Sequence, residues 1–407
     1  MKHIAVVGAS LAAAHAIEGL RERGYKHDIT LVGAERRLPY TRPPLSKESL
    51  AGTQDHESLA LHPGEWYDEQ GVRLMLGSPA VSLDAGARRL VTGDGGTVDY
   101  DGLVIATGSR ARTLVLPGSA EPIRTLRTID DSLRLHENMI PGQHLTVIGA
   151  GFVGLEVAAT VRQLGLEVTV VEVERAPLTR VFGQAVGSWF RRLHERNGVQ
   201  MRCGSHLDSL DRTDDAMTLC FRGGERIRTD HVIAGVGAVP AVEWLEGSGV
   251  EVTNGVACHP DLRTSVPDVV AAGDVARWRN PLFDEEMRVE HWTNAVEQGR
   301  HAAGTLLGDR TPFESVPYFW TDQFDAKVRF VGRARSGDDV IIEREDESSL
   351  VARYGRAGLL RGAVCVGSPR LLAKYRAAIA AGTRWEDCRQ TGPPTPSPGD
   401  LQHHLTF

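Results

Sequence analysis

Cysteine is scarce in this chain and never closely spaced. The five cysteines among its 407 residues are Cys203, Cys220, Cys258, Cys365 and Cys388. No C-x-x-C or C-x-x-x-x-C pair exists that could ligate a metal or act as a redox dithiol. The spacing favours scattered thiols in a reducing compartment and no metal site. It argues against a disulfide reductase, and the absence of cysteine before residue 203 argues against an oxidase or peroxidase with an early reactive thiol.

Long apolar runs and an excess of positive charge are also missing. No apolar run reaches the roughly 18–20 residues that a membrane span requires. The net charge is −7, whereas nucleic acid and anionic membranes select a basic face, so the sequence predicts neither partner. The opening MKHIAVVGAS enters a buried-strand pattern directly, without the charged and apolar regions of a signal peptide. We therefore expect a cytoplasmic protein.

What the chain does contain is a strand–helix–strand pattern that occurs twice. Residues 3–8 form an apolar run, residues 9–24 have helical spacing that stops at Gly24, and residues 28–33 form a second apolar run. The same order recurs at 144–151, 152–165 and 167–173. Continuous apolar strands alternating with helices are typical of parallel sheets covered on both faces. The sequence thus predicts an α/β protein with two doubly wound, Rossmann-like nucleotide domains.

The rest of the chain suggests how these domains are connected. Three segments, at 103–108, 231–240 and 268–276, each contain an apolar strand that ends in glycine. They are interpreted as chain crossings, so that the second nucleotide domain is inserted in the first. From about residue 313, alternating polarity predicts a C-terminal α+β domain with an antiparallel sheet, followed by a helix at 371–382. The Pro-rich stretch from Gly392 is expected to be a poorly ordered tail or a strap. The predicted domains are 1–112 and 240–312 for the first nucleotide, 113–239 for the second, and 313–407.

The second glycine fingerprint is the more regular one. Gly149, Gly151 and Gly154 form a strict G-x-G-x-x-G between a strand and a helix. In this pattern the glycines permit a tight turn, close approach of a pyrophosphate, and close packing of helix on strand. Glu172 ends the next strand, where a carboxylate accepts hydrogen bonds from a ribose diol and repels a 2′-phosphate. The segment predicts an NADH site, although Arg175 nearby leaves some use of NADPH open.

The first fingerprint departs from that pattern. It reads Gly8-Ala9-Ser10-Leu11-Ala12-Ala13, with serine and alanine in place of the second and third glycines. These residues are small enough for a nucleotide to approach, and Glu35 follows the second strand as a ribose ligand. A purely structural turn is the alternative on this segment alone. Ala106-Thr107-Gly108 and Gly273-Asp274, each after an apolar strand, favour an FAD site.

Further motifs make the chain resemble a known family. They are RPPLSK at 42–47, the glycine run ending at Glu156, LRT at 126–128, GD at 273–274, WTNA at 292–295 and FWTDQ at 319–323. Together they resemble the NADH-dependent ferredoxin reductases that serve oxygenases, a family that includes putidaredoxin reductase and the reductase component of biphenyl dioxygenase. The resemblance covers residues 3 to about 380. One departure is Ala241, where the family often has asparagine.

The resemblance implies roles for individual residues. Lys47 would lie by the flavin and pair with Glu156, and these two would form the catalytic pair. A buried lysine needs such a partner, and its charge would stabilise the reduced flavin. Asp274 would bind the ribityl chain and Trp292 would cover the flavin. The full set implied for FAD is Gly8, Ser10, Leu11, Ala13, Glu35, Arg42, Lys47, Val81, Ala106, Thr107, Gly108, Arg127, Asp274 and Trp292. The set for NADH is Gly149, Gly151, Phe152, Val153, Gly154, Glu156, Glu172, Gly235, Val236 and Gly237.

The implied function is electron transfer from NADH through FAD, one electron at a time, to an iron–sulfur ferredoxin. That ferredoxin would serve either a haem monooxygenase or a ring-hydroxylating dioxygenase. An apoptosis-inducing-factor-like redox sensor and a rubredoxin reductase remain alternatives, and the protein could be a monomer or a homodimer. Arg277, Trp278, Arg279, Arg333 and Arg335 are a candidate basic patch for an acidic ferredoxin, with an ordinary solvated surface as the alternative.

Overall fold

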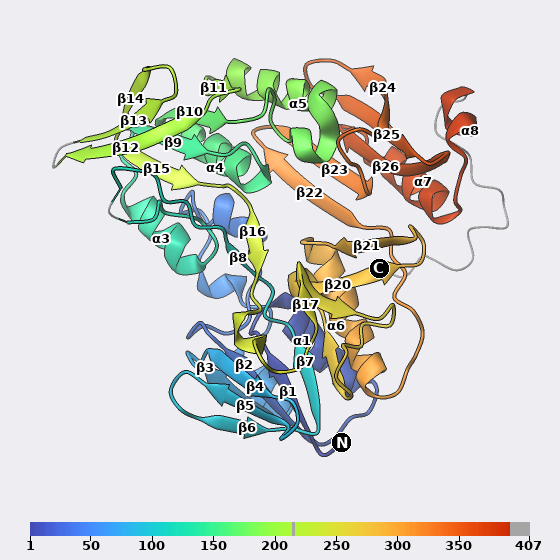
Figure 1. Cartoon of the computed structure of the whole chain (residues 1–407). Helices are drawn as coiled ribbons and strands as arrows, with labels where there is room; N and C mark the ends of the chain where they lie inside the picture. Colours follow the sequence, from blue (N-terminus) through green and yellow to red (C-terminus); the bar gives the residue numbers. More distant parts are fainter. Residues whose placement is uncertain (120, 214–215, 391–407) are drawn as a thin grey trace. The chain divides into compact units, whose positions relative to one another are not determined.

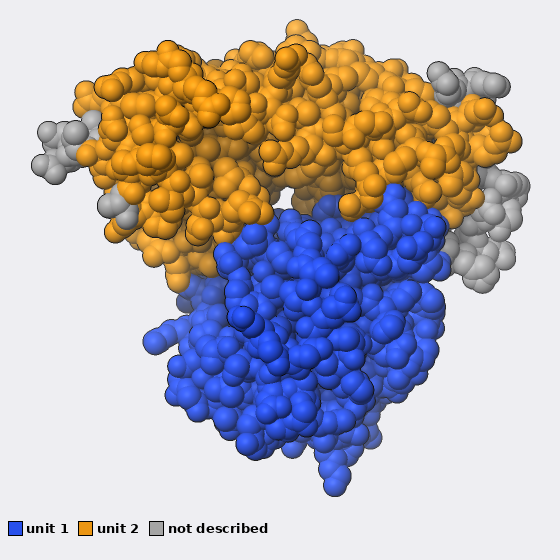
Figure 2. Space-filling view, viewed as in Figure 1, with its two compact units in different colours: residues 1–43, 55–110, 238–317 blue, residues 44–54, 111–237, 318–407 orange. Residues whose placement is uncertain are grey.

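The structure is a computed structural model that describes residues 1–119, 121–213 and 216–390. The chain divides into two compact units, which Figure 2 colours separately. Unit 1 consists of residues 1–43, 55–110 and 238–317. Unit 2 consists of residues 44–54, 111–237 and 318–407. Each unit is therefore built from three separate stretches of sequence.

Unit 1 is organised around a five-stranded parallel sheet (Figure 1). Its strands, in spatial order, are β19 (Val269–Ala271), β7 (Gly102–Ile105), β1 (His3–Val7), β2 (Asp28–Gly33) and β3 (Val72–Leu76). The apolar residues of β19, β7, β1 and β2 are almost completely buried, as expected for strands covered on both faces, whereas the edge strand β3 is only partly buried. Helices α1 (Leu11–Glu22) and α6 (Trp292–Leu306) pack together. Small residues permit this approach, since a Cβ on Gly299 would lie 2.4 Å from the carbonyl oxygen of Ala12.

Two smaller sheets complete unit 1. One contains β4 (Ala80–Asp84), β5 (Arg89–Thr92) and β6 (Thr97–Asp99) in antiparallel order. The other contains β17 (Val252–Thr253), β18 (Gly255–Cys258), β20 (Ala276–Asn280) and β21 (Glu285–Arg288). The short helices are α2 (Gly64–Glu69) and the 3₁₀ turns η2 (Glu57–Leu59), η3 (Glu243–Leu245) and η4 (Gly273–Val275). Another 3₁₀ turn, η1, spans Pro43–Ser46 where the chain leaves unit 1.

Unit 2 repeats the parallel arrangement. Its sheet has the order β11 (Gln200–Cys203), β10 (Glu167–Glu172), β9 (His144–Ile148) and β15 (His231–Ala234). Its helices are α3 (Ile129–Glu137), α4 (Phe152–Gln163) and α5 (Thr179–Arg196). An antiparallel sheet of β12 (Leu207–Thr213), β13 (Ala216–Phe221) and β14 (Arg226–Thr229) lies between β11 and β15 in the sequence. Both units thus contain the predicted doubly wound sheet.

The C-terminal part of unit 2 is an antiparallel sheet with two helices. The sheet has the order β22 (Tyr318–Gln323), β23 (Ala326–Gly332), β26 (Leu359–Val366), β25 (Leu350–Arg356) and β24 (Asp339–Glu345), followed by α7 (Pro369–Ala380) and α8 (Trp385–Gln390). Phe319, Phe330 and Tyr354 of this sheet share one core with Phe182 of α5. The Tyr354 hydroxyl also donates to the carbonyl of Phe182 at 3.1 Å. The predicted tail from Gly392 lies outside the described residues.

The interpretation of the three segments as chain crossings is wrong for their buried strands, but the segment at 231–240 does contain a crossing. Those strands are β7, β15 and β19, and each lies within a parallel sheet. The chain passes between the units at β8 (Ser109–Ala111), directly after the segment at 103–108, and at β16 (Ala238–Pro240), within the segment at 231–240. These two short strands pair as a two-stranded sheet. The segments at 103–108 and 268–276 lie wholly in unit 1, so a crossing follows the first and is absent from the second. Among the described helices, none is long and apolar enough to cross a membrane.

Candidate active site

Three of the segments predicted to bind FAD meet at the carboxyl ends of the unit 1 parallel strands. Gly8 follows β1 with a φ of +109°, and a Cβ there would lie 2.1 Å from the carbonyl oxygen of Ala106, just after β7. Gly273 follows β19 with a φ of +80°, and its Cβ would lie 3.0 Å from the Cβ of Ala12. Strand order reverses between β1 and β7, and open α/β sheets bind ligands at such points.

The first turn of α1 faces this point with unsatisfied donors. Ser10 is the N-cap residue in an extended conformation, and its side chain makes no capping hydrogen bond. The first N–H groups of an α-helix lack acceptors within the helix, and its dipole favours an anion there. The following residues Leu11, Ala12 and Ala13 are buried and mostly small. This cradle, which larger side chains would fill, fits the diphosphate of a dinucleotide.

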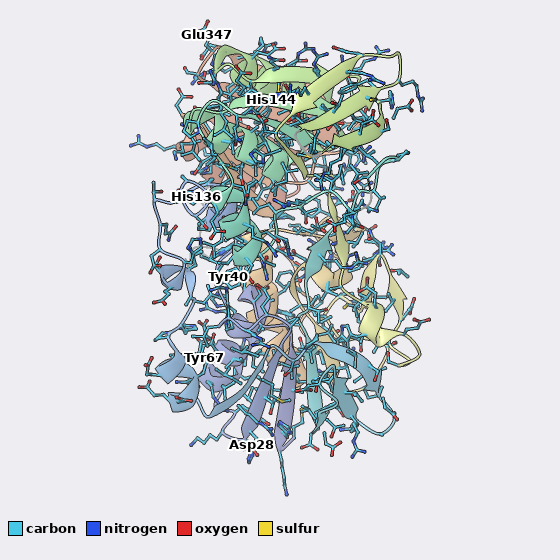
Figure 3. All side chains as sticks on the ribbon, turned by 90° about the vertical axis from the view of Figure 1, so that its left-hand side faces the viewer. Asp28, Tyr40, Tyr67, His136, His144 and Glu347 are labelled. Carbon is cyan, nitrogen blue, oxygen red and sulfur yellow. The ribbon has the colours of Figure 1, made fainter. Side chains whose placement is uncertain are left out.

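Glu35 lies two residues beyond β2 in a cluster of polar groups. Its Oε1 accepts a hydrogen bond from the guanidinium of Arg42 at 2.7 Å, and its Oε2 accepts one from the Tyr40 hydroxyl at 2.7 Å. The Arg42 guanidinium also donates to the Tyr40 hydroxyl at 2.8 Å. Burial lowers the pKa of Arg42, but Tyr40 and Glu35 outweigh it, so the net pKa is raised. Tyr40, labelled in Figure 3, was not singled out from the sequence.

Asp274 and Trp292 are held by other residues of unit 1. The Asp274 carboxylate accepts from the Ser109 hydroxyl at 3.0 Å, and its carbonyl accepts from Arg288 at 2.9 Å. Trp292, half-buried, opens α6 and donates from Nε1 to the Thr41 hydroxyl at 3.2 Å. The backbone therefore brings Asp274 to the carboxyl end of the sheet, as predicted for a ribityl ligand.

The other predicted FAD residues are distributed over both units. Thr107 donates from its hydroxyl to the carbonyl of Ala241 at 2.7 Å, and Gly108 has a φ of +66°. Val81 is 50% exposed on β4. Arg127 and Lys47 belong to unit 2, where Arg127 donates from its backbone to the Asp131 carboxylate at 3.1 Å. Their contact with FAD stays a prediction.

The strict fingerprint of unit 2 forms a tight turn between β9 and α4. Gly149 has a φ of +100°, and a Cβ there would lie 2.5 Å from the carbonyl oxygen of Gly235. A Cβ on Gly154 would lie 2.3 Å from the carbonyl oxygen of Gly149, so the helix closes directly on the turn. Gly151 differs, because its nearest neighbour would be 3.8 Å away. The space beside Gly151 fits a diphosphate at the start of α4.

Glu172 lies beside this turn at the end of β10. Its Oε2 accepts from the backbone N–H of Ala150 at 2.7 Å, and its Oε1 accepts from the N–H of Glu174 at 2.9 Å. An ionised carboxylate has about four acceptor sites, so both oxygens keep capacity for a ribose diol. Glu172 therefore also braces the glycine turn, a role that the sequence did not suggest.

The remaining NADH residues fall into two groups. Phe152 packs its ring against Phe319 and Phe182, with centroids 4.6 and 5.7 Å apart, so its side chain belongs to the core of unit 2. Val153 is 46% exposed at the start of α4. Gly235, Val236 and Gly237 follow β15, and Gly237 has a φ of +102°. The contacts of Phe152, Val153 and the glycines after β15 with NADH stay a prediction.

Glu156, two residues beyond the fingerprint, is the centre of a buried polar cluster in unit 2. It is 7% exposed, and Lys47 lies 3.2 Å from its Oε2. The Ser46 hydroxyl donates to Oε2 at 2.5 Å, and the Thr321 hydroxyl donates to Oε1 at 2.7 Å. A buried carboxylate is costly unless it is paired and hydrogen-bonded, and here a cation and two hydroxyls supply these contacts. The structure brings together Lys47 and Glu156, the pair expected from the sequence.

Ser46 and Thr321 were quoted within motifs but not named as site residues. Ser46 is further held because its carbonyl accepts from the Thr160 hydroxyl on α4 at 2.7 Å. Thr321 lies on β22, where alternate residues are buried, so it shares the buried face with Phe319 and Gln323. Position on the buried face of a strand, with a polar side chain, is the signal that could have found Thr321.

The candidate basic patch is wrong for Trp278. This tryptophan is fully buried, and its Nε1 donates to the carbonyl of Phe313 at 3.2 Å. Arg279 forms an ion pair with Asp284, and Arg277 lies 3.7 Å from Glu286. These arginines thus carry their own counter-charges on β20 and its neighbours. Strand alternation explains the error, because Trp278 points to the opposite face from its two arginine neighbours.

Comparison with known proteins places this geometry in context. Residues 2–299 match the profile of the family described as pyridine nucleotide-disulphide oxidoreductase, and residues 318–395 match one described as reductase C-terminal. Rhodocoxin reductase from Rhodococcus erythropolis is 36% identical, with 90% of this chain and 87% of that protein covered. The anthranilate 1,2-dioxygenase system ferredoxin–NAD(+) reductase component from Burkholderia cepacia is 34% identical, with 96% and 97% covered.

A solved structure shows the same likeness in three dimensions. The crystal structure of the covalent putidaredoxin reductase–putidaredoxin complex contains a chain that matches this one with a TM-score of 0.89 at 31% identity. The match covers 94% of this chain and 93% of that one. The two nucleotide folds and the C-terminal antiparallel sheet are therefore shared with that structure.

Proposed function

Because the chain belongs to the pyridine nucleotide-disulphide oxidoreductase family, we propose that it is an FAD-dependent NADH:ferredoxin reductase. It takes electrons from NADH and passes them one at a time to an iron–sulfur ferredoxin that serves an oxygenase. The similar rhodocoxin reductase and anthranilate dioxygenase reductase component point to this branch of the family. The domains proposed for this function are 1–112 and 240–312 for FAD, 113–239 for NADH, and 313–407 for the partner.

The observation that carries the proposal is the position of Glu156 on α4. This helix begins at the fingerprint glycines, and two residues further it carries the carboxylate that lies 3.2 Å from Lys47. The charge of Lys47 is thereby held in place by the helix whose start fits the NADH diphosphate. FAD, when bound, can accept a hydride and release electrons one at a time. Lys47 supplies a fixed positive charge for the reduced cofactor, and Glu156 orients that charge.

The family name includes disulphide oxidoreductases, yet the cysteines argue against that chemistry. All five are free, and none occurs near Lys47 in the RPPLSK segment. Burial raises the pKa of Cys258 and of Cys365 to about 12, which disfavours the nucleophilic thiolate. A protein acceptor of single electrons therefore fits the chain better than a disulfide. The free thiols also suit a cytoplasmic location, which we propose as the compartment of the enzyme.

The test is the reaction itself. The FAD-loaded protein should lose its flavin absorbance when NADH is added without oxygen, and it should reduce ferricyanide and a ferredoxin in turn. A protein that reduces neither ferricyanide nor any ferredoxin with NADH is not a reductase of this kind. Loss of ferredoxin reduction alone, with slow flavin reoxidation, would favour the apoptosis-inducing-factor-like redox sensor. Efficient turnover with rubredoxin only would identify a rubredoxin reductase.

A lysine variant extends this test to the site. Lys47→Met removes the charge next to Glu156, so ferricyanide reduction should fall by at least about tenfold, the effect of losing roughly 1.4 kcal/mol of transition-state stabilisation. Lys327→Met is the matched control, since Lys327 is 65% exposed and pairs with Asp322 on the antiparallel sheet. Ferricyanide reduction should stay unchanged in the control. Equal rates in both variants would remove Lys47 from the catalytic pair.

A further inference from the structure

A line of buried hydrogen bonds in unit 2 leads away from Glu156. The Thr321 hydroxyl donates to Glu156 Oε1 at 2.7 Å, and Gln323 Nε2 donates to the Thr321 hydroxyl at 3.2 Å. Gln323 Oε1 then lies 3.0 Å from Nε2 of His194 on α5. Thr321 is 1% exposed, and Gln323 and His194 are fully buried. Three elements, α4, β22 and α5, are therefore joined by one polar chain inside an apolar core.

Resting on the proposed function, we propose that His194, Gln323 and Thr321 are positioning residues that fix the orientation of the Glu156 carboxylate toward Lys47. None of the three would touch a cofactor. They act by presenting a single directed donor to Oε1, while Ser46 presents one to Oε2. With both oxygens held, the carboxylate plane cannot rotate freely, and the ammonium of Lys47 keeps one position.

The direction of every hydrogen bond in this chain follows from the charge on Glu156. An ionised carboxylate only accepts, so Thr321 must use its one proton toward Glu156. Its oxygen can then only accept from Gln323, which turns the amide NH₂ toward Thr321 and the amide oxygen toward His194. The imidazole must therefore donate from Nε2. Each of these hydrogen bonds is therefore donated in the same direction, from His194 toward Glu156.

The surroundings of His194 suit that role. Burial lowers the pKa of His194 to about 4, the hydrogen bond to Gln323 raises it in part, and the charge of Arg196 lowers it. The ring is neutral near pH 7, so a proton on Nε2 leaves Nδ1 as a bare acceptor. Nδ1 has no hydrogen-bond partner within the described residues. The ring also packs edge-on against Phe324, with centroids 5.2 Å apart, which holds its plane.

Paired variants of the FAD-loaded protein test the proposal kinetically. Thr321→Val keeps the shape of the side chain and removes the donor, whereas Thr321→Ser keeps the donor. We expect Thr321→Val to slow flavin reduction at saturating NADH by about tenfold, the typical effect of one charge-assisted hydrogen bond, with the KM for NADH changed by less than about twofold. Thr321→Ser should restore the rate. Unchanged reduction in Thr321→Val, or equal slowing in Thr321→Ser, would overturn the proposal.

His194, at the far end of this series of hydrogen bonds, provides a second pair of variants. His194→Leu removes the donor to Gln323, and His194→Gln can restore one. A smaller loss of flavin reduction in His194→Leu, about threefold, should be reversed in His194→Gln because each further hydrogen bond transmits less. Thr305→Val is the matched control, since the buried Thr305 hydroxyl donates to the carbonyl of Asp261 in unit 1. It should lower the melting temperature without slowing flavin reduction. A matching kinetic loss in the control would leave only a general structural effect.

The tautomer of His194 is a readout that does not depend on activity. In protein with ¹⁵N-labelled histidine, the signal that disappears in His194→Gln identifies His194. At pH 7 this signal should show a proton on Nε2 and none on Nδ1. A proton on Nδ1, or a charged ring, would contradict the proposed series of hydrogen bonds. If the wild-type protein binds FAD but NADH does not reduce the flavin, the proposed function is wrong. The tautomer of His194 still tests whether the series of hydrogen bonds is formed.

Discussion

Glu172 has two roles at the same position. The carboxylate accepts from two backbone N–H groups of unit 2 and lies where a ribose diol would bind. In the proposed NADH site this charge would disfavour NADPH, because a 2′-phosphate would face a like charge. The same charge stabilises the glycine turn, since hydrogen bonds to an ionised acceptor are stronger than neutral ones. We therefore expect coenzyme preference and turn geometry to be coupled in Glu172.

Replacing Glu172 with glutamine should weaken that preference. The amide presents one acceptor instead of two, so the ratio of kcat/KM for NADH to that for NADPH should fall by about tenfold, which corresponds to roughly 1.4 kcal/mol of discrimination. Steady-state rates with each coenzyme measure the ratio. Glu174→Gln is the control, since only the backbone N–H of Glu174 contacts Glu172, while its carboxylate lies 3.3 Å from Arg180. A ratio that falls equally in the control would mean that general charge, not Glu172, sets the preference.

The sequence predicted charged site residues better than hydroxyl ones. Lys47 and Glu156 could be paired through the family resemblance, and an expensive buried charge needs such a partner. Ser46 and Thr321 could not, because a hydroxyl donates in whichever direction its rotamer and neighbours permit. That direction depends on how β22 packs on α4, which is a property of the folded unit. The prediction that Trp278 belongs to a surface patch was wrong for a related reason, since the sheet face on which its side chain lies depends on strand register.

Among the helices and strands, those with a strong hydrophobic pattern could be predicted from the sequence, and those with a weak pattern could not. The central parallel strands are short and largely buried, for example Val168–Val171 in β10. The antiparallel sheet of β4, β5 and β6 was missed, because its strands have three to five residues and mixed exposure. The kinked helix α5 was missed as well. Its interruption at Gly183, which has φ 77° and ψ 167°, breaks the helical period in the sequence.

The β9–α4 turn lets two glycine substitutions be distinguished. Gly151→Ala should fold normally, because Gly151 has a φ of −79° and its Cβ would find no atom within 3.8 Å. The new methyl group would instead meet the diphosphate, so the KM for NADH should rise by about tenfold or more. Gly149→Ala should lower the free energy of unfolding by about 1–3 kcal/mol, because residue 149 needs a positive φ and its new Cβ would meet the Gly235 carbonyl. Chemical denaturation and NADH titration separate the two effects. Equal stability of the two variants would contradict this account of the turn.

Each unit of the molecule has a core of its own. One apolar cluster contains only unit 1 residues, from Ala5 to Ala276, and two others contain only unit 2 residues. The two doubly wound folds were readable from the sequence because each βαβ unit closes its own sheet. The strands β8 and β16 have three residues each and no periodicity of their own, so the sequence indicated a crossing only through the segment at 231–240, which contains β16.

Separate cores imply that a defect in the first nucleotide fold should leave the second intact. Asp274→Ala removes the acceptor of the Ser109 hydroxyl at the carboxyl end of the unit 1 sheet, so the purified protein should hold much less FAD. The NADH fold of unit 2 contains none of the altered residues, and NADH should still bind, with an affinity within about threefold of wild type, as expected for distant independent sites. Flavin absorbance gives the FAD content, and the change in NADH fluorescence gives the affinity.

Gly151→Ala is the reciprocal variant, because it should keep full FAD content and lose affinity for NADH. The two variants together form a crossed test of the whole molecule. If Asp274→Ala lost both nucleotides while retaining its circular dichroism spectrum, binding of NADH would require the occupied FAD fold. The two sites would then be one coupled system, and the reduced affinity for NADH would measure the coupling free energy directly. If each variant loses only its own nucleotide, the separate cores of the two units are sufficient to build the two sites independently.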